Sequence, residues 1–144
     1  MKTFLKSVLL LSLSSLPTQI FASQKPNAEL ICYLEKQVGA KTTVYRIGGL
    51  LASDEDNAEH FSLVEDLSIT VEQNFKVQIN NAPLRRLEQL DPFSVWTLDR
   101  SQNGLFVYLD SPIRFGVPIK VRHFLNNSQK SFVISSTCDV LLGH

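Results

Sequence analysis

The chain lacks most of the features from which a function is usually inferred. Its 144 residues include one tryptophan, one methionine, two cysteines and six glycines, and 14 basic side chains balance 14 acidic ones. The zero net charge removes the overall basic excess that is typical of nucleic-acid-binding domains. A composition of 44% hydrophobic and 19% charged residues excludes a disordered chain. The length suits one domain and is short for two.

Signatures of the common enzyme classes are also missing. The chain has no G-x-S-x-G elbow, no H-E-x-x-H pair, no C-x-x-C pair and no nucleotide-binding glycine loop. An acidic run at 54–57 has the spacing that begins an EF-hand, but Ala58 and Glu59 stand where that loop needs an oxygen ligand and a glycine. We predict a solvated loop there, with a looser calcium site as the alternative. We expect no metal and no cofactor.

The first 22 residues have the pattern of a secretory signal peptide. Lys2 and Lys6 supply positive charge, the run 8–16 is apolar with interspersed serines, and Ala22 is the small residue before a cleavage point. A membrane anchor is the alternative, but a spanning helix needs about 20 apolar residues. We predict a signal peptide over 1–22 and one exported domain over 23–144. That domain would be periplasmic or secreted, without stable membrane insertion after cleavage.

The two cysteines are informative through their separation. Cys32 and Cys138 lie 106 positions apart, and an even number of cysteines in an exported chain favours a disulfide. Closing so long a loop is worth up to about 4.7 kcal/mol in the chain-entropy model. Two buried thiols or a metal pair are the alternatives, although two thiolates cannot complete a four-ligand zinc site. We predict a Cys32–Cys138 disulfide.

Alternation with a period of two dominates the body of the chain. Its longest run is 61–71, where Phe61, Leu67 and Ile69 fall on one face and polar residues fall mainly on the other. This pattern is typical of a half-buried strand in an antiparallel sheet. Shorter strands are predicted within 29–36, 42–47, 75–79, 94–99, 105–110, 117–125 and 131–140.

Two pairs of these segments are predicted to form hairpins. Segments 94–99 and 105–110 flank a turn that ends in Asn103-Gly104, a dipeptide that readily adopts positive φ. Segments 117–125 and 131–140 flank a second polar turn. Seven or eight strands at spacings of about 8–12 residues predict an all-β fold: a single antiparallel β-sandwich of immunoglobulin-like architecture, or a small barrel.

One stretch departs from this alternation. Leu84, Leu87 and Leu90 recur at every third residue between two prolines. This spacing predicts one short helix of about two turns. An irregular crossover is the alternative.

A basic and aromatic stripe is the main candidate site. Lys120, Arg122 and Phe124 alternate along one predicted strand and therefore share a face. Such a stripe suits an acidic partner, although the solvated face of a sheet is the ordinary alternative. Trp96 is a further candidate anchor because aromatic residues are enriched in interface hot spots, while a lone tryptophan in a sandwich is more often core. We predict these four residues as partner-binding.

The histidines offer an alternative chemistry. His60 follows the acidic run, and His123 shares its predicted strand face with apolar residues. A catalytic histidine needs a nucleophile and an orienting acid nearby. For His123 we predict instead a partly buried histidine at a strand end, with its ring hydrogen-bonded to the backbone.

These observations favour a binding protein over an enzyme. We predict a non-enzymatic periplasmic or secreted domain that binds another envelope or secreted protein and no nucleic acid. It would act as an inhibitor of a hydrolase or as an immunity protein against a toxin. The alternatives are a subunit or accessory of a pilus-like surface assembly, which would add a strand across chains, and, less favoured, a small hydrolase.

Overall fold

The computed structural model describes residues 25–90, 92–98, 104–124 and 131–143. The predicted signal peptide and the tips of both predicted hairpins lie outside these residues. No helix in the described part is long and apolar enough to cross a membrane.

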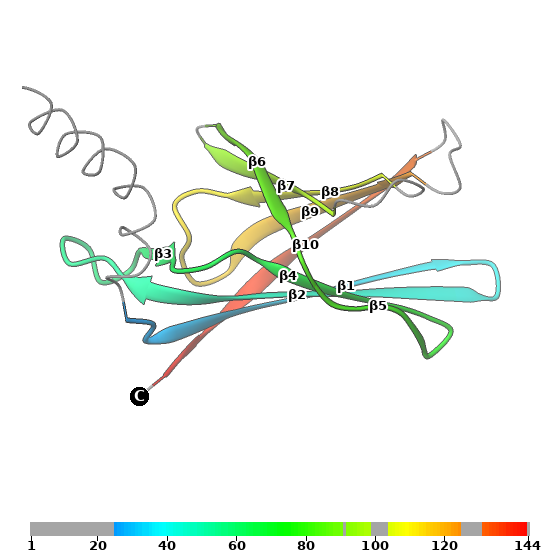
Figure 1. Cartoon of the computed structure of the whole chain (residues 1–144), viewed down its shortest axis with the longest axis horizontal. Coiled ribbons are helices and arrows are strands. Elements are labelled where there is room, and N and C mark those ends of the chain that lie inside the picture. Colours follow the sequence, from blue (N-terminus) through cyan, green and yellow to red (C-terminus); the bar gives the residue numbers. More distant parts are fainter. Residues whose placement is uncertain (1–24, 91, 99–103, 125–130, 144) are drawn as a thin grey trace, which may run out of the picture.

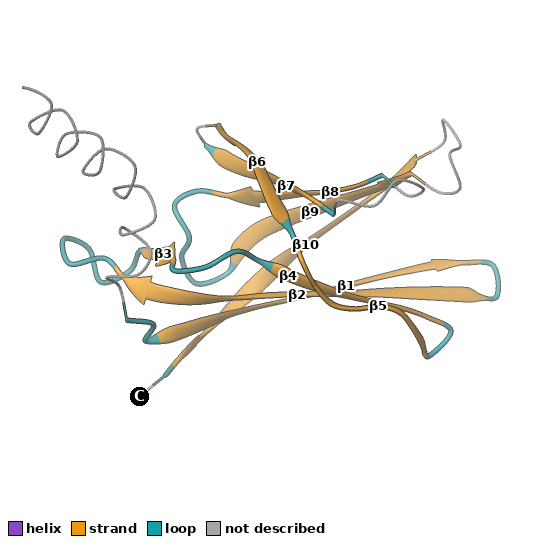
Figure 2. Ribbon diagram, viewed as in Figure 1, coloured by secondary structure: helices purple, strands orange, loops and turns teal. Residues whose placement is uncertain are grey.

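The described residues form ten β-strands and no helix (Figure 1, Figure 2). The strands are β1 Ala28–Val38, β2 Lys41–Ser53, β3 Phe61–Leu63, β4 Ser68–Gln73, β5 Lys76–Pro83, β6 Arg85–Leu90, β7 Phe93–Thr97, β8 Leu105–Asp110, β9 Val117–Phe124 and β10 Ser131–Leu142.

All ten strands belong to one antiparallel sheet. Its order is β5-β4-β2-β1-β10-β9-β8-β7-β6, and the short β3 pairs with β2. The two outermost strands, β5 and β6, follow one another in sequence with only Leu84 between them. The chain thus passes directly from one edge of the sheet to the other, which requires the sheet to curl. The all-β antiparallel prediction is confirmed, and the curled sheet is compatible with a sandwich or a small barrel.

Period-two alternation places the core on the concave side of the sheet. In β8 and β9 every second residue is almost fully buried, and inward residues of neighbouring strands are in register, as in Val107 opposite Val121. The same alternation turns the intervening residues outward. The largest fully buried side chains include Leu30, Leu34, Tyr45, Ile47, Leu51, Leu67, Ile69, Leu84, Trp96, Leu105, Val107 and Leu109.

The predicted helix around Leu84 and Leu87 is wrong. Residues 85–90 form β6, an edge strand that pairs with β7, and the register shifts between Arg86 and Glu88. This irregularity breaks the alternation, so that the leucines recur at a spacing of three without a helix. Leu84 is buried, whereas Leu87 is exposed.

Two strand boundaries also differ from expectation. The predicted strand 61–71 is divided into β3 and β4, because residues 64–67 bend away from the ladder. Conversely, Gly48 and Gly49 do not end their strand, and β2 continues to Ser53. Gly49 lies where an added Cβ would come within 3.0 Å of the Leu63 and Leu67 side chains. A glycine in a strand interior here marks a close approach of neighbouring chain.

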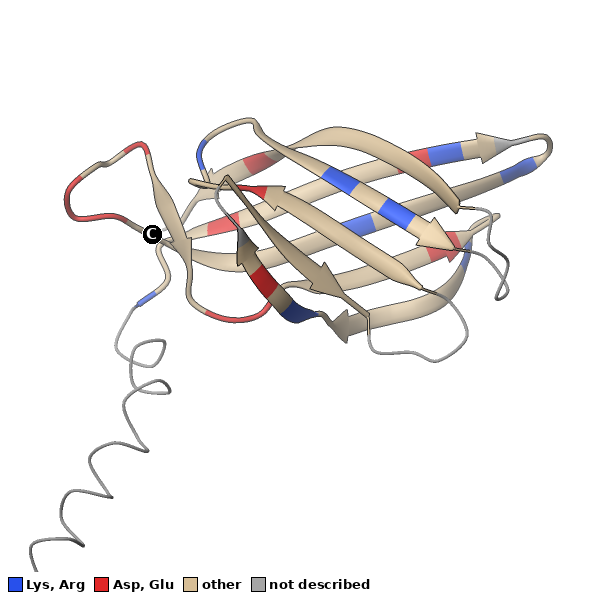
Figure 3. Ribbon diagram, turned by 90° about the horizontal axis from the view of Figure 1, so that it is seen from above, with Lys and Arg blue, Asp and Glu red and all other residues tan. Residues whose placement is uncertain are grey.

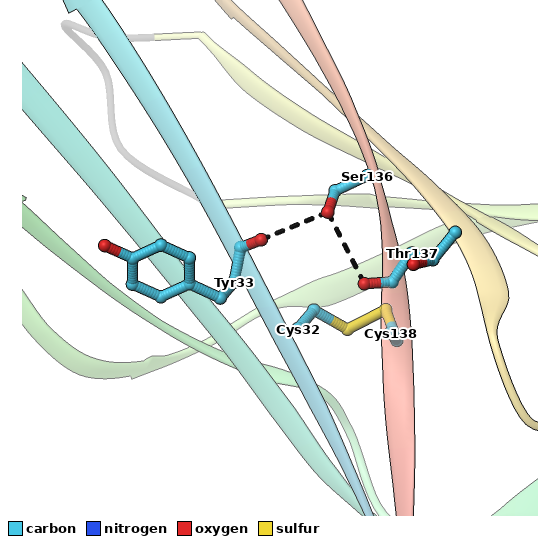
Figure 4. Close-up of a disulfide and its surroundings, with 5 residues drawn as sticks. All are labelled: Cys32, Tyr33, Ser136, Thr137 and Cys138. Carbon is cyan, nitrogen blue, oxygen red and sulfur yellow. Dashed lines mark hydrogen bonds between the residues drawn. A yellow bond between two sulfur atoms is a disulfide. The ribbon is translucent and has the colours of Figure 1, made fainter.

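The predicted disulfide is present where β1 and β10 meet. Cys32 and Cys138 are paired in register, with both side chains buried and the Cα atoms 4.3 Å apart. The β1–β10 ladder begins at Ala28 opposite Leu142 and ends at this cysteine pair. Beyond it, β1 continues beside β2 alone and β10 beside β9 alone. Figure 4 shows the two ribbons separating from the disulfide onward.

Candidate functional site

The predicted stripe lies on the outer face of β9. Lys120 and Arg122 are exposed and Phe124 is half-buried, while Val121 and His123 between them point into the core. The structure therefore brings three of the four predicted binding residues together on one face. No described interaction ties Lys120 or Arg122 to an acidic side chain, since the ion pair among the described residues joins Arg46 to Glu72.

Neighbouring strands flank these cations with aromatic and aliphatic side chains. Arg122 lies between Phe106 of β8 and Val133 of β10, and Lys120 lies between Tyr108 and Ser135. Phe106 packs edge-to-face on Phe124, with ring centroids 6.3 Å apart. We define the outer β7–β10 face as the outward residues Phe93, Val95, Phe106, Tyr108, Lys120, Arg122, Phe124, Val133 and Ser135.

Phe106, Tyr108 and Val133 were not among the predicted binding residues. For Val133 the predicted hairpin of 117–125 with 131–140 contained the necessary signal, because residues opposite one another in a hairpin share a face. Phe106 and Tyr108 lie beside the stripe through the β8–β9 pairing, which was not among the predicted hairpins.

Trp96 does not lie on this face. Its side chain is only 2% exposed, and its Nε1–H donates to Ser94 Oγ at 2.9 Å. The Arg86 guanidinium lies 5.9 Å from the centroid of the ring, an arrangement that favours a cation–π contact. Trp96 thus occupies the core position that is usual for a lone tryptophan, and its ring is not available to a partner at the outer face.

A shallow cleft adjoins Trp96 at the edge of the sheet. Its volume is about 210 Å³, and polar side chains from β3, β6 and β8 line it, including Ser62, Arg86, Gln89 and Asp110. This volume is below the roughly 300–1,000 Å³ of most small-molecule sites. Its polar lining suits ordered water better than an apolar ligand.

Tyr45 and His123 form a polar pair inside the sheet. The Tyr45 hydroxyl lies 2.6 Å from His123 Nδ1, although β2 and β9 are separated in the sheet by β1 and β10. Phe132 packs against both rings, and the Lys36 ammonium lies 5.9 Å above the Phe132 ring. The predicted burial of His123 is confirmed by its 6% exposure, but the expected backbone partner is wrong, because the described partner of its ring is the Tyr45 hydroxyl.

Burial keeps both side chains of this pair uncharged. Desolvation lowers the pKa of His123 and raises the pKa of Tyr45, so that both side chains are neutral near pH 7. When the Tyr45 hydroxyl donates to Nδ1, the imidazole proton resides on Nε2. Nε2 is buried and has no hydrogen-bond partner among the described residues.

The other candidates from the sequence lie apart from this pair. His60 contacts the Asn57 amide, and the loop between β2 and β3 carries several acidic side chains, as Figure 3 shows. Within that loop Asp54 accepts a hydrogen bond from Ser62 Oγ at 2.9 Å. No group of three or more His, Cys, Asp or Glu side chains in the described part of the chain could hold a metal ion.

Comparison with known proteins does not place the chain in a family. No family model, no curated protein and no solved structure matches it significantly. The function of the chain is therefore inferred from the arrangement of its own side chains.

Proposed function

We propose that this chain is a non-enzymatic protein of the periplasm or the secreted medium that binds another exported protein through the outer β7–β10 face. The observation that carries the proposal is the position of Lys120 and Arg122, two exposed cations that take no part in the described ion pair, between half-buried Phe106 and Tyr108 and exposed Val133. An inhibitor of a hydrolase or an immunity protein against an envelope-acting toxin is the role we favour.

The chemistry of this face supports a protein partner. Interface cores are enriched in aromatic residues and arginine, and the strongest contributions come from such anchors. Phe106 and Tyr108 are each held by an edge-to-face neighbour, Phe124 and Phe93 respectively. Side chains fixed in this way lose little conformational entropy when a partner covers them. Strand β8, which carries both rings, is paired with β7 on one side and β9 on the other, and this pairing holds the rings in place.

The charge on the face indicates the kind of partner. Two cations separated by one inward residue favour a partner with acidic side chains, which would be attracted before contact and paired after it. A disulfide is consistent with an oxidising compartment, and it supports the proposal that this partner is met outside the cytoplasm.

The proposal is tested by charge reversal with a matched control. The tagged exported protein is used to capture a partner from envelope extract, and the affinity of the isolated partner is then measured. Lys120→Glu with Arg122→Glu should weaken binding by about a hundredfold, since losing charge pairs at an interface costs roughly 2–5 kcal/mol.

The control variant carries Lys41→Glu with Lys76→Glu, two exposed lysines of β2 and β5 away from the face. It changes the net charge equally and should leave the affinity within about twofold. Equal losses in both variants, or no loss in either, would show that the outer β7–β10 face is not the binding site.

A further inference from the structure

The first half of β10 has a main-chain edge that no described strand covers. Residues 131–137 pair with β9 on one side, while the ladder with β1 on the other side stops at Cys138. Near the disulfide the gap is bridged, because Ser136 Oγ donates to the Tyr33 carbonyl oxygen at 3.2 Å (Figure 4). The free edge is therefore the five residues 131–135.

This edge differs from the other free edges of the sheet. Natural sheets protect exposed edges with charges, prolines, bulges or very short strands. Here β5 carries Lys76, Pro83 and register shifts, and β6 carries Arg85, Arg86, Glu88 and a register shift. The second half of β1 carries Glu35 and Lys36.

The β10 edge carries none of these protections in its own sequence, although the Lys36 ammonium of β1 lies 5.9 Å from the centroid of the Phe132 ring. Its sequence from Ser131 to Ser135 is SFVIS, without charge, proline or glycine, and its pairing with β9 is regular. Three of the five residues are β-branched or aromatic, which is the composition that favours strand pairing. Val133 is 41% exposed.

We infer that a second copy of this chain pairs with residues 131–135, so that two β10 strands join antiparallel about a twofold axis at Val133. This inference goes beyond the proposed binding of another protein and does not depend on it. A twofold interface requires a surface that is complementary to itself. The pairing places Ser131 opposite Ser135 of the partner copy and Phe132 opposite Ile134.

This register places side chains of similar chemistry opposite one another on both faces of the joined sheet. Phe132 and Ile134 are half-buried and lie on the core side, so their pairing extends the apolar core across the axis. On the outer side, Val133 meets its own symmetry mate between two serine pairs. Cross-strand pairs of this kind each contribute favourably to sheet stability.

Charge also favours a second copy at this edge. Pairing β10 with β1, β5 or β6 of another molecule would bring Glu35, Lys36, Lys76 or the β6 arginines to an uncharged strand, and such unlike contacts do not close into a dimer. On the outer side of the β10–β10 pair, the nearest repeated cations among the described residues are Arg122 and its mate. They stand three strand spacings apart, about 14 Å, beyond the roughly 8 Å screening length of physiological salt.

The joined sheet would place two outer β7–β10 faces side by side. The twofold axis at Val133 is perpendicular to the sheet, so the outer faces of both copies point in the same direction. A dimer would therefore offer an extended surface with four cations, two from each copy. Five residues bury less than a standard interface of about 1,600 Å², so the association should be weak in isolation.

Sedimentation equilibrium of the exported, disulfide-bonded chain tests this inference. From about 10 µM to 1 mM, the average mass should rise from that of the monomer toward that of the dimer, as for a small interface. Val133→Lys should raise the dissociation constant about tenfold or more by the edge protection described for natural sheets. Val77→Lys is the matched control, because Val77 is 55% exposed on the outermost strand β5, and it should leave the dimer unchanged.

A covalent readout tests the register separately. Val133→Cys should give an intermolecular disulfide on mild oxidation, whereas Val77→Cys should remain monomeric. A wild-type chain that stays monomeric at 1 mM would overturn the inference. A dimer that resists Val133→Lys, or that responds equally to Val77→Lys, would also overturn it, since pairing would then use another surface.

Discussion

The two ends of the β1–β10 pair are built on different principles. At one end, from Ala28 to Cys32, the strands are hydrogen-bonded in register, joined by the disulfide and backed by apolar side chains such as Leu30 and Val140. At the other end the strands separate, and the interior is filled by Tyr45, His123 and Phe132. We call these the closed end and the open end.

The contrast shows that one pattern of alternation can lead to two kinds of packing. At the closed end, backbone pairing and a covalent bond restrain the strands, and the core needs no polar group. At the open end one hydrogen bond between two buried side chains connects β2 to β9 across the gap. A buried polar pair is stabilising only while both partners are present, so we expect the open end to be the more easily disrupted.

Removing the disulfide should have the largest effect on stability. Replacing Cys32 and Cys138 with alanine leaves the closed end without its covalent bond, and loss of a native disulfide typically costs about 2–5 kcal/mol. The free energy of unfolding can be measured in urea through Trp96, the one tryptophan of the chain. Reduced wild-type protein should unfold at the same urea concentration as the double variant. Adding a reductant should not change the unfolding of the double variant. Unchanged unfolding after reduction would contradict this account of the closed end.

Removing one hydroxyl at the open end should have an intermediate effect. Tyr45→Phe leaves His123 Nδ1 buried without its donor, and an unsatisfied buried polar atom costs about 1–3 kcal/mol. Tyr108→Phe is the control, because Tyr108 is a half-buried residue of the outer face, and it should cost less than about 0.5 kcal/mol.

Replacing both partners separates the contribution of the hydrogen bond to stability from the contribution of side-chain packing. Tyr45→Phe combined with His123→Leu removes the donor and the acceptor together. The combined loss should be smaller than the sum of the single losses, because neither polar atom is then left alone. Additive losses would show that the two side chains act independently and that the contact does not hold the open end.

Acid should weaken the open end by a smaller amount. Burial lowers the pKa of His123 in the folded chain, whereas the unfolded chain has the ordinary value of about 6.5. Below about pH 6.5 the unfolded state binds the proton first, so the free energy of unfolding falls with falling pH, by at most about 1.4 kcal/mol per pH unit. The free energy of unfolding returns to its full value as the pH rises above about 6.5.

Histidine variants identify the group responsible. His123→Gln should flatten the decline of stability between about pH 6.5 and 5, where an ordinary histidine takes up its proton. His60→Gln, in the loop before β3, should retain the decline. His123 contacts the neutral Tyr45 hydroxyl and the Phe132 ring, and the Lys36 ammonium lies over that ring; none of these groups offers a negative charge to stabilise an imidazolium. A decline unchanged in His123→Gln would assign the effect to other groups.

Much of the sheet could be predicted from the chain because alternation is a local property. The buried side of β9 follows from alternation, the two hairpins follow from the polar turns between alternating segments, and the disulfide follows from the even number of cysteines in a chain predicted to be exported. Residues 85–90 could not be assigned correctly, since their strand state depends on pairing with β7 and on the irregularity at Arg86. Sequence reasoning had no means of detecting that β2 and β9 come together across the sheet, so the Tyr45–His123 contact was missed.

The residues of the outer β7–β10 face could be predicted only in part, because alternation is a local property. Lys120, Arg122 and Phe124 lie on one strand, where parity alone places them together. Their neighbours Phe106 and Val133 required the inter-strand register. For Trp96 the sequence left both a core and an interface position open. Its burial against Ser94 and Arg86 in the structure decides between them.

Because β1 and β10 are the first and last strands described, their ladder cannot form until almost all of the chain between them has been made. Cys32 emerges early and must wait for 106 further positions before its partner arrives. Pairings between such distant segments slow folding, and until they form β1 has only β2 beside it. The disulfide can therefore form only after Cys138 has been added, and a chain halted before Cys138 carries Cys32 as a lone thiol.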